Sequence, residues 1–196
     1  MYEDLFQVRS NDLTPTTGRI LIASPLIKDY HFQRSVVMLI NSEEKGNLGI
    51  VLNKELKVQM SLNELVHELD GFPRIPLYKG GPVNRYSLSF IHDIQEIDQS
   101  IPLGNGLFLN GSFNLMLKYI KQGNPIEGRV RFYMGLAGWN EGQLLTEIDN
   151  DTWIISNPRK DIIMGEDIGN MWKNSLDIMG EPYSTWSKYP LIPSMN

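Results

Sequence analysis

Short apolar runs separated by turn residues recur along most of the chain, and they predict β-strands. The first three runs are rich in Val, Ile and Leu, and they are bounded by Pro25 and by the charged, glycine-ended segment 43–46. Runs of this length between turn residues are typical of strands, and the charged segment indicates a hairpin. The predicted strands cover residues 18–23, 35–40, 48–53, 75–78, 86–92, 107–109, 129–134 and 152–156.

Four other segments carry apolar residues three and four positions apart, which predicts helices with one buried face. Ser61 and Glu64 have the spacing of a capping box, in which each side chain binds a free backbone N–H group. Ser112 is placed to cap the second helix. Asn140 is placed to cap the third, with Gln143 reaching back from the third helical position. The predicted helices cover residues 62–69, 113–120, 141–148 and 168–179.

These strands and helices do not alternate regularly, which favours an α+β fold over a doubly wound parallel sheet. We expect a single domain with a mixed β-sheet, partly curled into a barrel and flanked by helices. Its expected extent is 18–180, after a polar arm at 1–17. The tail at 181–196 is rich in proline and aromatic residues, and we expect it to pack as irregular chain.

The composition is that of an ordinary globular protein, with 41% hydrophobic and 21% charged residues. A net charge of -5 argues against broad attraction to nucleic acid or anionic lipid, so charge does not support direct DNA binding. The chain has no cysteine and no secretion signal at its start, and its longest clean apolar run is Val36–Ile40. We therefore expect a cytoplasmic protein that does not span a membrane.

Standard catalytic and cofactor motifs do not occur in complete form. His67-Glu68 opens like the zinc-binding HExxH motif, but Gly71 stands where the second histidine belongs. Gly104 and Gly106 lack the third glycine and the helix of a dinucleotide fingerprint, and there is no Gly-x-Ser-x-Gly elbow. We therefore expect neither a metal nor a cofactor, and the sequence assigns no catalytic residue.

Two glycine-rich segments are the first candidates for a site. Gly80-Gly81-Pro82 follows a predicted strand, where backbone N–H groups could hold an anion. The alternative, which we favour, is a turn that needs positive φ and whose exit is fixed by proline. The second segment, 135–142, is interpreted as a turn that leads into the third predicted helix.

A polar group follows the second glycine-rich segment. Gln143 and Glu147 are four residues apart and share one helix face, while Trp139 would sit at the turn. In one interpretation the three form a polar pocket floored by the indole. In the other, the indole packs under the turn and the two polar side chains are solvated. The sequence leaves both open.

Three isolated polar residues complete the set of candidates. Arg34 could bind a substrate or form a surface ion pair. Asn53 ends a buried-looking strand, where its amide is more often bound to turn backbone. His92 ends another strand and could be a general base, although a lone histidine there is more often hydrogen-bonded within the fold.

The order of these motifs resembles that of the AlgH/YqgE family of bacterial proteins. The similarity runs from about residue 18 to about residue 155, and it is carried by GRILIASPLIKDYHFQRSVVMLI, GNLGIVLNK, YKGGPVNRYSLSFIH and RVRFYMGLAGWNEGQLLTEIDNDTWII. Relatives often have proline shortly after the asparagine of the LN motif, where this chain has Glu55. That difference puts the loop after Asn53 in doubt and leaves the family resemblance intact.

The resemblance implies a cytoplasmic bacterial protein with a mixed, partly barrel-like sheet flanked by helices. The family's usual label is that of a transcriptional regulator, which defines no biochemical activity. The positions that match the family pattern have no agreed catalytic role; they are Phe32, Arg34, Asn53, Gly80, Gly81, Pro82, His92, Gly138, Trp139, Gln143 and Glu147.

Three functional hypotheses remain open at this point. The first, which we favour, is a regulatory binding protein that acts through a protein partner or a small ligand. The second is a hydrolase-like enzyme or ligand binder that uses a cleft between the two glycine-rich segments, with Glu147 or His92 as base. The third is an interaction scaffold that uses Trp139 and the aromatic tail.

Overall fold

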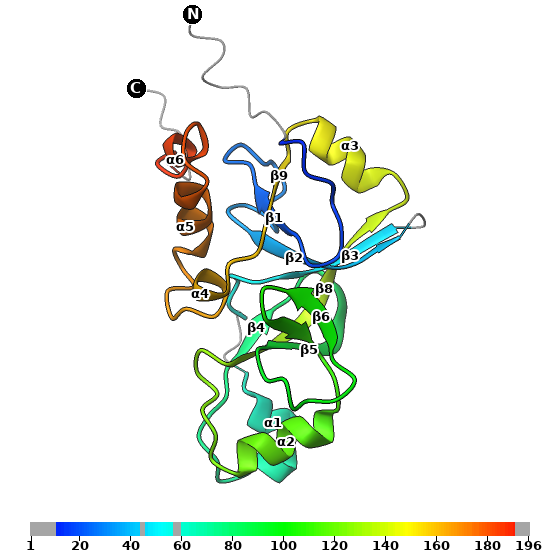
Figure 1. The fold of residues 1–196 in the computed structure, drawn as a ribbon, viewed down its shortest axis with the longest axis vertical. Helices are drawn as coiled ribbons and strands as arrows, with labels where there is room; N and C mark the ends of the chain where they lie inside the picture. The colour runs from blue at the N-terminus through cyan, green and yellow to red at the C-terminus, as the bar shows by residue number, and fades with distance from the viewer. Residues whose placement is uncertain (1–10, 44–45, 57–59, 191–196) are drawn as a thin grey trace, which may run out of the picture.

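The structure is a computed structural model, which describes residues 11–43, 46–56 and 60–190. The fold is a single α+β domain, in which one nine-stranded sheet is flanked by short helices (Figure 1). The strands are β1 (Ile20–Ala23), β2 (Val36–Glu43), β3 (Gly46–Val51), β4 (Leu77–Lys79), β5 (Val83–His92), β6 (Ile101–Gly104), β7 (Leu107–Leu109), β8 (Val130–Asn140) and β9 (Trp153–Ser156). The helices are α1 (Leu62–Leu65), α2 (Phe113–Lys121), α3 (Gln143–Asp149), α4 (Lys160–Ile163), α5 (Met171–Ile178) and α6 (Tyr183–Trp186), with a 3-10 turn at His67–Leu69.

The long strand β8 connects the two halves of the sheet. The strand order is β6-β7-β5-β8-β3-β2-β1-β9, and β4 is a further partner of β8. On one edge β8 pairs with β5. On the other edge it pairs first with β4, which is parallel to it, and then with β3, which is antiparallel. The sheet is therefore mixed but open, because it ends at β6 and β9, and the expected curl into a barrel is not confirmed.

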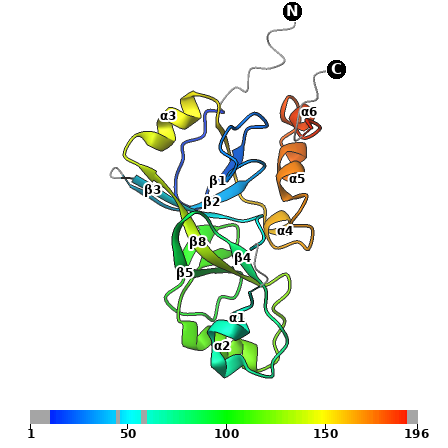
Figure 2. The same ribbon diagram turned by 180° about the vertical axis from the view of Figure 1, so that it is seen from behind.

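Both faces of the β1–β2–β3 region are covered, which explains why these strands read as continuous apolar runs. Helix α3 packs over one face, and α4, α5 and α6 stack along the other (Figures 1 and 2). Helices α1 and α2 lie together at the far end of the molecule, over the core that β4, β5 and β8 share with them. The sheet thus carries three adjoining apolar clusters.

Segment 135–140 is strand, where the sequence predicted a turn. The glycines permit this course, because Gly135 has φ +81° and the β5–β8 register shifts between Val83 and Leu88. Asn140 is the last residue of β8, and Gly142, with φ +70°, takes the N-cap position of α3. Gln143 does reach back as predicted, since its Oε1 accepts a hydrogen bond from the Asn140 backbone N–H at 3.0 Å.

The predicted capping box at the first helix is also wrong. Ser61 Oγ donates to Glu64 Oε1 at 2.8 Å, so the two side chains bind each other instead of capping the helix. That helix breaks at Val66, which has φ −129°. The predicted cap of α2 is confirmed, because Ser112 Oγ accepts from the Leu115 backbone N–H at 3.4 Å.

Three elements escaped the sequence analysis: β6, α4 and α6. Helix α6 lies in the tail that was expected to be irregular, and its Trp186 is buried in the core beneath α5. Tyr183 and Tyr189 pack partly against the same core. The tail aromatics in the described part of the chain therefore belong to the fold, which weakens the interaction-scaffold hypothesis. Within the described residues, no helix combines the length and apolar character needed to cross a membrane.

Candidate functional site

A pocket of about 520 Å³ opens beside α3, on the face of the sheet that this helix covers. Its wall is formed by the end of β8, the start of β9, helix α3 and the connection from β1 to β2. We call it the indole pocket, because two tryptophans form its floor. Its lining is Ser24, Leu26, Ile27, Lys28, Asp29, Phe32, Gly138, Trp139, Gln143, Glu147, Asn150, Asp151, Thr152 and Trp153.

Three aromatic rings pack against one another in this pocket. Trp139 and Trp153 meet edge to face with centroids 5.8 Å apart, and Phe32 lies 5.5 Å from the Trp153 ring. Both indoles are almost fully buried, whereas Phe32 is half-buried. Offset and edge-to-face contacts of this kind stabilise aromatic clusters beyond their buried area. The floor of the pocket is therefore rigid and apolar.

The Glu147 carboxylate is held by three donors at the edge of this floor. Trp139 Nε1 and Trp153 Nε1 both donate to its Oε2, at 2.9 and 2.7 Å. Gln143 Nε2 donates to Oε1 at 2.8 Å. The sequence placed Gln143 and Glu147 on one helix face near Trp139, and the structure brings these three together.

This arrangement leaves the pocket with an acceptor-rich, acidic wall. A carboxylate offers about four lone-pair positions, so Glu147 can accept one further hydrogen bond at Oε1. Asp29 and Asp151 also line the pocket, and Lys28 is the one cationic side chain among the described residues that line it. The chemistry therefore suits a small molecule with an apolar body and an N–H or ammonium donor.

The expected cleft between the two glycine-rich segments is not present; the segments are packed backbone against backbone. A Cβ on Gly81 would lie 2.1 Å from the Leu136 carbonyl, and one on Gly80 would lie 2.2 Å from the Gly135 oxygen. Gly80 also donates its N–H to Met134 and accepts from Val51 N–H. Gly80 thus fills the point where β8 changes partner from β4 to β3, so close backbone packing, in addition to the positive φ of Gly81, accounts for the two glycines.

The neighbouring proline and the strand-end asparagine also have backbone partners. The Pro82 carbonyl accepts from Arg85 Nε at 3.2 Å. Asn53 Oδ1 accepts from the Val36 backbone N–H at 2.9 Å, and its Nδ2 donates to the Arg34 carbonyl at 2.8 Å. Asn53 therefore fixes the chain before β2, the role that side-chain amides at strand ends commonly have.

Arg34 lies on the opposite face of the sheet from the indole pocket. Its guanidinium stacks over the Trp172 ring at 5.0 Å from the centroid and donates to the Tyr189 carbonyl. Arg34 also has a φ of +52°, which is uncommon for a residue with a long side chain. The structure thus separates Arg34 from Trp139, Gln143 and Glu147.

His92 is fully buried and hydrogen-bonded within the fold, and it does not line the indole pocket. Its Nε2 lies 2.8 Å from the Asn110 carbonyl, and its Nδ1 accepts from the Ile94 backbone N–H at 3.2 Å. These partners fix a neutral ring with the proton on Nε2. Burial lowers the pKa of the His92 imidazole below its ordinary value of 6.5. His92 is thus placed as a structural residue.

The depressed pKa of His92 predicts a loss of stability on acidification. Below about pH 6.5 the unfolded chain binds a proton that the folded chain resists, so the free energy of unfolding falls as pH falls. One proton limits this slope to about 1.4 kcal/mol per pH unit. Urea unfolding between pH 7 and 5 should show the slope, and His92→Gln should remove most of it. His67→Gln, at an exposed histidine, is the control and should leave the slope unchanged.

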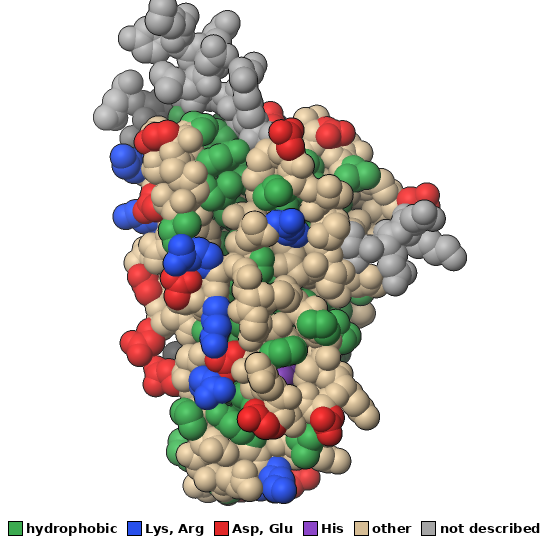
Figure 3. Space-filling view, in the orientation of Figure 1, with side chains coloured by type: hydrophobic (Ala, Val, Ile, Leu, Met, Phe, Trp, Pro, Cys, Tyr) green, Lys and Arg blue, Asp and Glu red, His purple; other side chains and the backbone are tan. Residues whose placement is uncertain are grey.

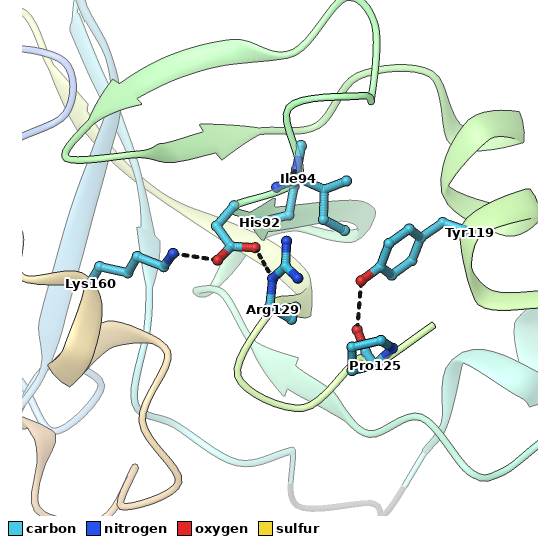
Figure 4. Close-up of polar contacts among 7 residues, drawn as sticks. His92, Ile94, Tyr119, Pro125, Arg129 and Lys160 are labelled. Carbon is cyan, nitrogen blue, oxygen red and sulfur yellow. Dashed lines mark hydrogen bonds and ion pairs between the residues drawn. The ribbon is translucent and has the colours of Figure 1, made fainter. Parts of the chain in front are cut away.

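The residue after His92 forms an ion-pair junction between β5 and α4. Burial alone would raise the pKa of the Asp93 carboxyl, but hydrogen bonds from Lys160 and Arg129 outweigh it and hold this pKa below its usual range. Figure 4 shows Lys160 and Arg129 reaching the same carboxylate, that of Asp93, from opposite sides. The junction fastens the helical side of the molecule to the sheet, and each oxygen of its carboxylate accepts from one cationic side chain.

Sequence reasoning missed Trp153 as a member of the site. The sequence predicted Trp153 only as part of an apolar strand, because no regular spacing indicates that residues 139 and 153 are in contact. The two indoles meet only because β9 pairs with β1 at the far edge of the sheet. Among the described residues, no group of three or more His, Asp or Glu side chains is arranged to hold a metal ion.

Comparisons with known proteins give one consistent family. A family model described as AlgH-like matches residues 20–184. A UPF0301 protein of Bacteroides fragilis is 44% identical over 98% of this chain and 97% of its own length. A UPF0301 protein of Parabacteroides distasonis is 42% identical over 100% of this chain and 98% of its own.

Two solved structures share the fold. A crystal structure of a protein from Corynebacterium diphtheriae superposes with a TM-score of 0.76 at 24% identity, covering 91% of this chain and 95% of that one. The solution structure of the AlgH protein from Pseudomonas aeruginosa gives a TM-score of 0.67 at 24% identity, covering 92% and 98%. None of these names states a biochemical activity.

Proposed function

This chain belongs to the AlgH-like family, and from that premise we propose that it is a regulatory binding protein that takes up a small ligand in the indole pocket. The observation that carries the proposal is the Glu147 carboxylate, fixed by two indole N–H groups and one amide at the wall of an open pocket. Most ligand sites combine apolar walls with a few fixed polar groups, and this one has both. We place its action in the cytoplasm, in keeping with a chain that has no cysteine.

Regulation through a ligand or partner is favoured over direct reading of DNA. Acidic and basic side chains alternate along the edge formed by α4, α5 and α6 (Figure 3). A protein that enters a DNA groove needs clustered Lys and Arg on one element, and the net charge here is -5. A ligand that changes the shape of the indole pocket would instead alter the surface at α3 for a protein partner.

The hydrolase-like alternative has less support. Gly80 and Gly81 are packed against β8, and His92 is buried elsewhere, so neither adjoins the indole pocket. Glu147 remains the one candidate base from the sequence that lines a pocket. Its carboxylate is engaged by three donors, which suits a fixed binding group better than a group that must accept a proton.

Binding can be tested with phenethylamine as a probe, which has an apolar ring and an ammonium donor. We expect it to shift the NMR resonances of the Trp139 and Trp153 indole N–H groups, and phenylacetate to have little effect. Glu147→Gln should weaken phenethylamine binding about tenfold or more, the size of one charged hydrogen bond. Glu141→Gln is the control, because it removes the same charge from an exposed residue outside the pocket. This variant should bind phenethylamine as tightly as the native protein does. Equal binding to all three proteins would overturn the proposal.

A further inference from the structure

Four basic side chains gather where the β1–β2 connection meets the ends of β3 and β4. They are His31 and Arg34 from the β1–β2 connection, Lys54 after β3 and Lys79 at the end of β4. All four are half-buried. Lys79 Nζ lies 3.5 Å from His31 Nδ1, and Lys54 Nζ donates to the Gln33 carbonyl at 2.5 Å. We call these four residues the basic cluster.

The backbone forces two of these charges together. The Lys79 N–H donates to the Lys54 carbonyl at 2.9 Å, so the two lysines leave from adjacent extended segments. Like charges on neighbouring strands destabilise a sheet, and partial burial increases the cost because less water screens them. The fold nevertheless keeps both lysines in a chain whose net charge is -5.

Among the described residues, no carboxylate forms an ion pair with these groups. Asp29, the nearest acidic residue in the same loop, uses its Oδ1 to accept the His31 backbone N–H. Burial lowers the pKa of the Lys54 ammonium, and the positive charges of Lys79 and Arg34 lower it further. The cluster is therefore a half-buried region of positive charge.

The arginine of the cluster is fixed before any ligand arrives. Trp172 supports one face of the Arg34 guanidinium, and the Tyr189 carbonyl accepts from its Nη2. Asn53 holds the Arg34 carbonyl, which stabilises the unusual positive φ of that residue. A guanidinium has five N–H donors, so several remain for a ligand. A fixed guanidinium together with two ammonium groups is a donor set that binds phosphate groups in many proteins.

From this geometry we propose that Arg34, Lys54, Lys79 and His31 form a binding site for a phosphate group, free or carried by a small metabolite. A bound dianion would sit among the cationic groups and remove the repulsion between Lys54 and Lys79. It would also connect the β1–β2 loop with the ends of β3 and β4. This site is separate from the indole pocket, so its existence does not depend on the proposed ligand there.

Calorimetric titration of the full-length protein with inorganic phosphate tests this site. We expect saturable binding at an ionic strength held constant with sodium chloride. Lys54→Met and Lys79→Met should each raise the dissociation constant about tenfold or more, because each removes a charged hydrogen-bond donor. Lys121→Met is the control, since this exposed lysine ends α2 at the far end of the molecule (Figure 1). Its dissociation constant should equal that of the native protein.

Further measurements on the native protein keep the test decisive if a variant fails to fold. The pKa of the Lys54 ammonium, followed by NMR, should rise when phosphate is added and should not rise with chloride. Glycerol 3-phosphate that binds more tightly than phosphate would indicate a phosphorylated metabolite, and equal affinity would indicate the free ion. Succinate that binds as tightly as phosphate, an unmoved Lys54 pKa, or equal affinity in Lys54→Met and Lys121→Met would each overturn the proposal.

Discussion

Replacing Gly81 with alanine should cost more than about 4 kcal/mol of folding free energy, or prevent folding, because the new Cβ would overlap the β8 backbone. That Cβ would lie 2.1 Å from the carbonyl carbon and oxygen of Leu136. Backbone cannot yield as a flexible side chain can, and Gly81 also has φ +152°. The steric overlap and the backbone strain both act at the point where the pairing partner of β8 changes from β4 to β3. Urea unfolding followed by circular dichroism measures the loss.

Two other glycines separate steric overlap from backbone strain. Gly142 has φ +70° but nothing within 4 Å of a new Cβ, so Gly142→Ala should cost only about 1–2 kcal/mol. Gly169 has open space and no positive φ, so Gly169→Ala should be close to neutral. A Gly81→Ala protein as stable as Gly142→Ala would contradict the close packing of the two glycine-rich segments.

Replacing Trp153 with alanine should cost about 3–5 kcal/mol and abolish binding in the indole pocket. Only 1% of this residue is exposed. Its ring contacts Phe32 and Trp139, and its Nε1 holds Glu147 at 2.7 Å. The substitution therefore removes the packed floor of the pocket and one of the three donors that position its carboxylate. Thermal and urea unfolding measure the first effect, and the phenethylamine titration measures the second.

Trp153→Phe distinguishes these two contributions. It keeps an aromatic ring on the floor but removes the N–H donor, so we expect a loss of roughly 1–3 kcal/mol, closer to the cost of one charged hydrogen bond. Phenethylamine should still bind, with reduced affinity because Glu147 is less firmly held. If Trp153→Phe and Trp153→Ala lost the same stability, ring packing would not be what shapes the pocket.

The β1–β2 connection contributes to both proposed sites. Phe32 lines the indole pocket, while His31 and Arg34 belong to the basic cluster. Asn53 holds the end of this connection by two hydrogen bonds. Loops positioned by a rigid sheet commonly carry binding residues. A ligand at one site would therefore restrain the same short segment that serves the other site.

The sequence alone determined the secondary elements whose patterns are local. Apolar runs located β1, β2 and β3, and helical spacing with Ser112 located α2. The one-face relation of Gln143 and Glu147 also follows from helix geometry, and their hydrogen bond is present at 2.8 Å. The family resemblance was likewise correct, because ordered motifs are a property of the sequence itself.

Only the tertiary structure decided where distant residues meet. Strand β8 continues through the glycines that suggested a turn, because pairing with β3 supplies partners that local propensity does not register. Trp153 reaches Trp139 through sheet pairing, and four basic residues from three segments form one cluster. Local spacing fixes which side chains share an element. Long-range pairing and packing fix which elements share a site, and that information is not periodic along the chain.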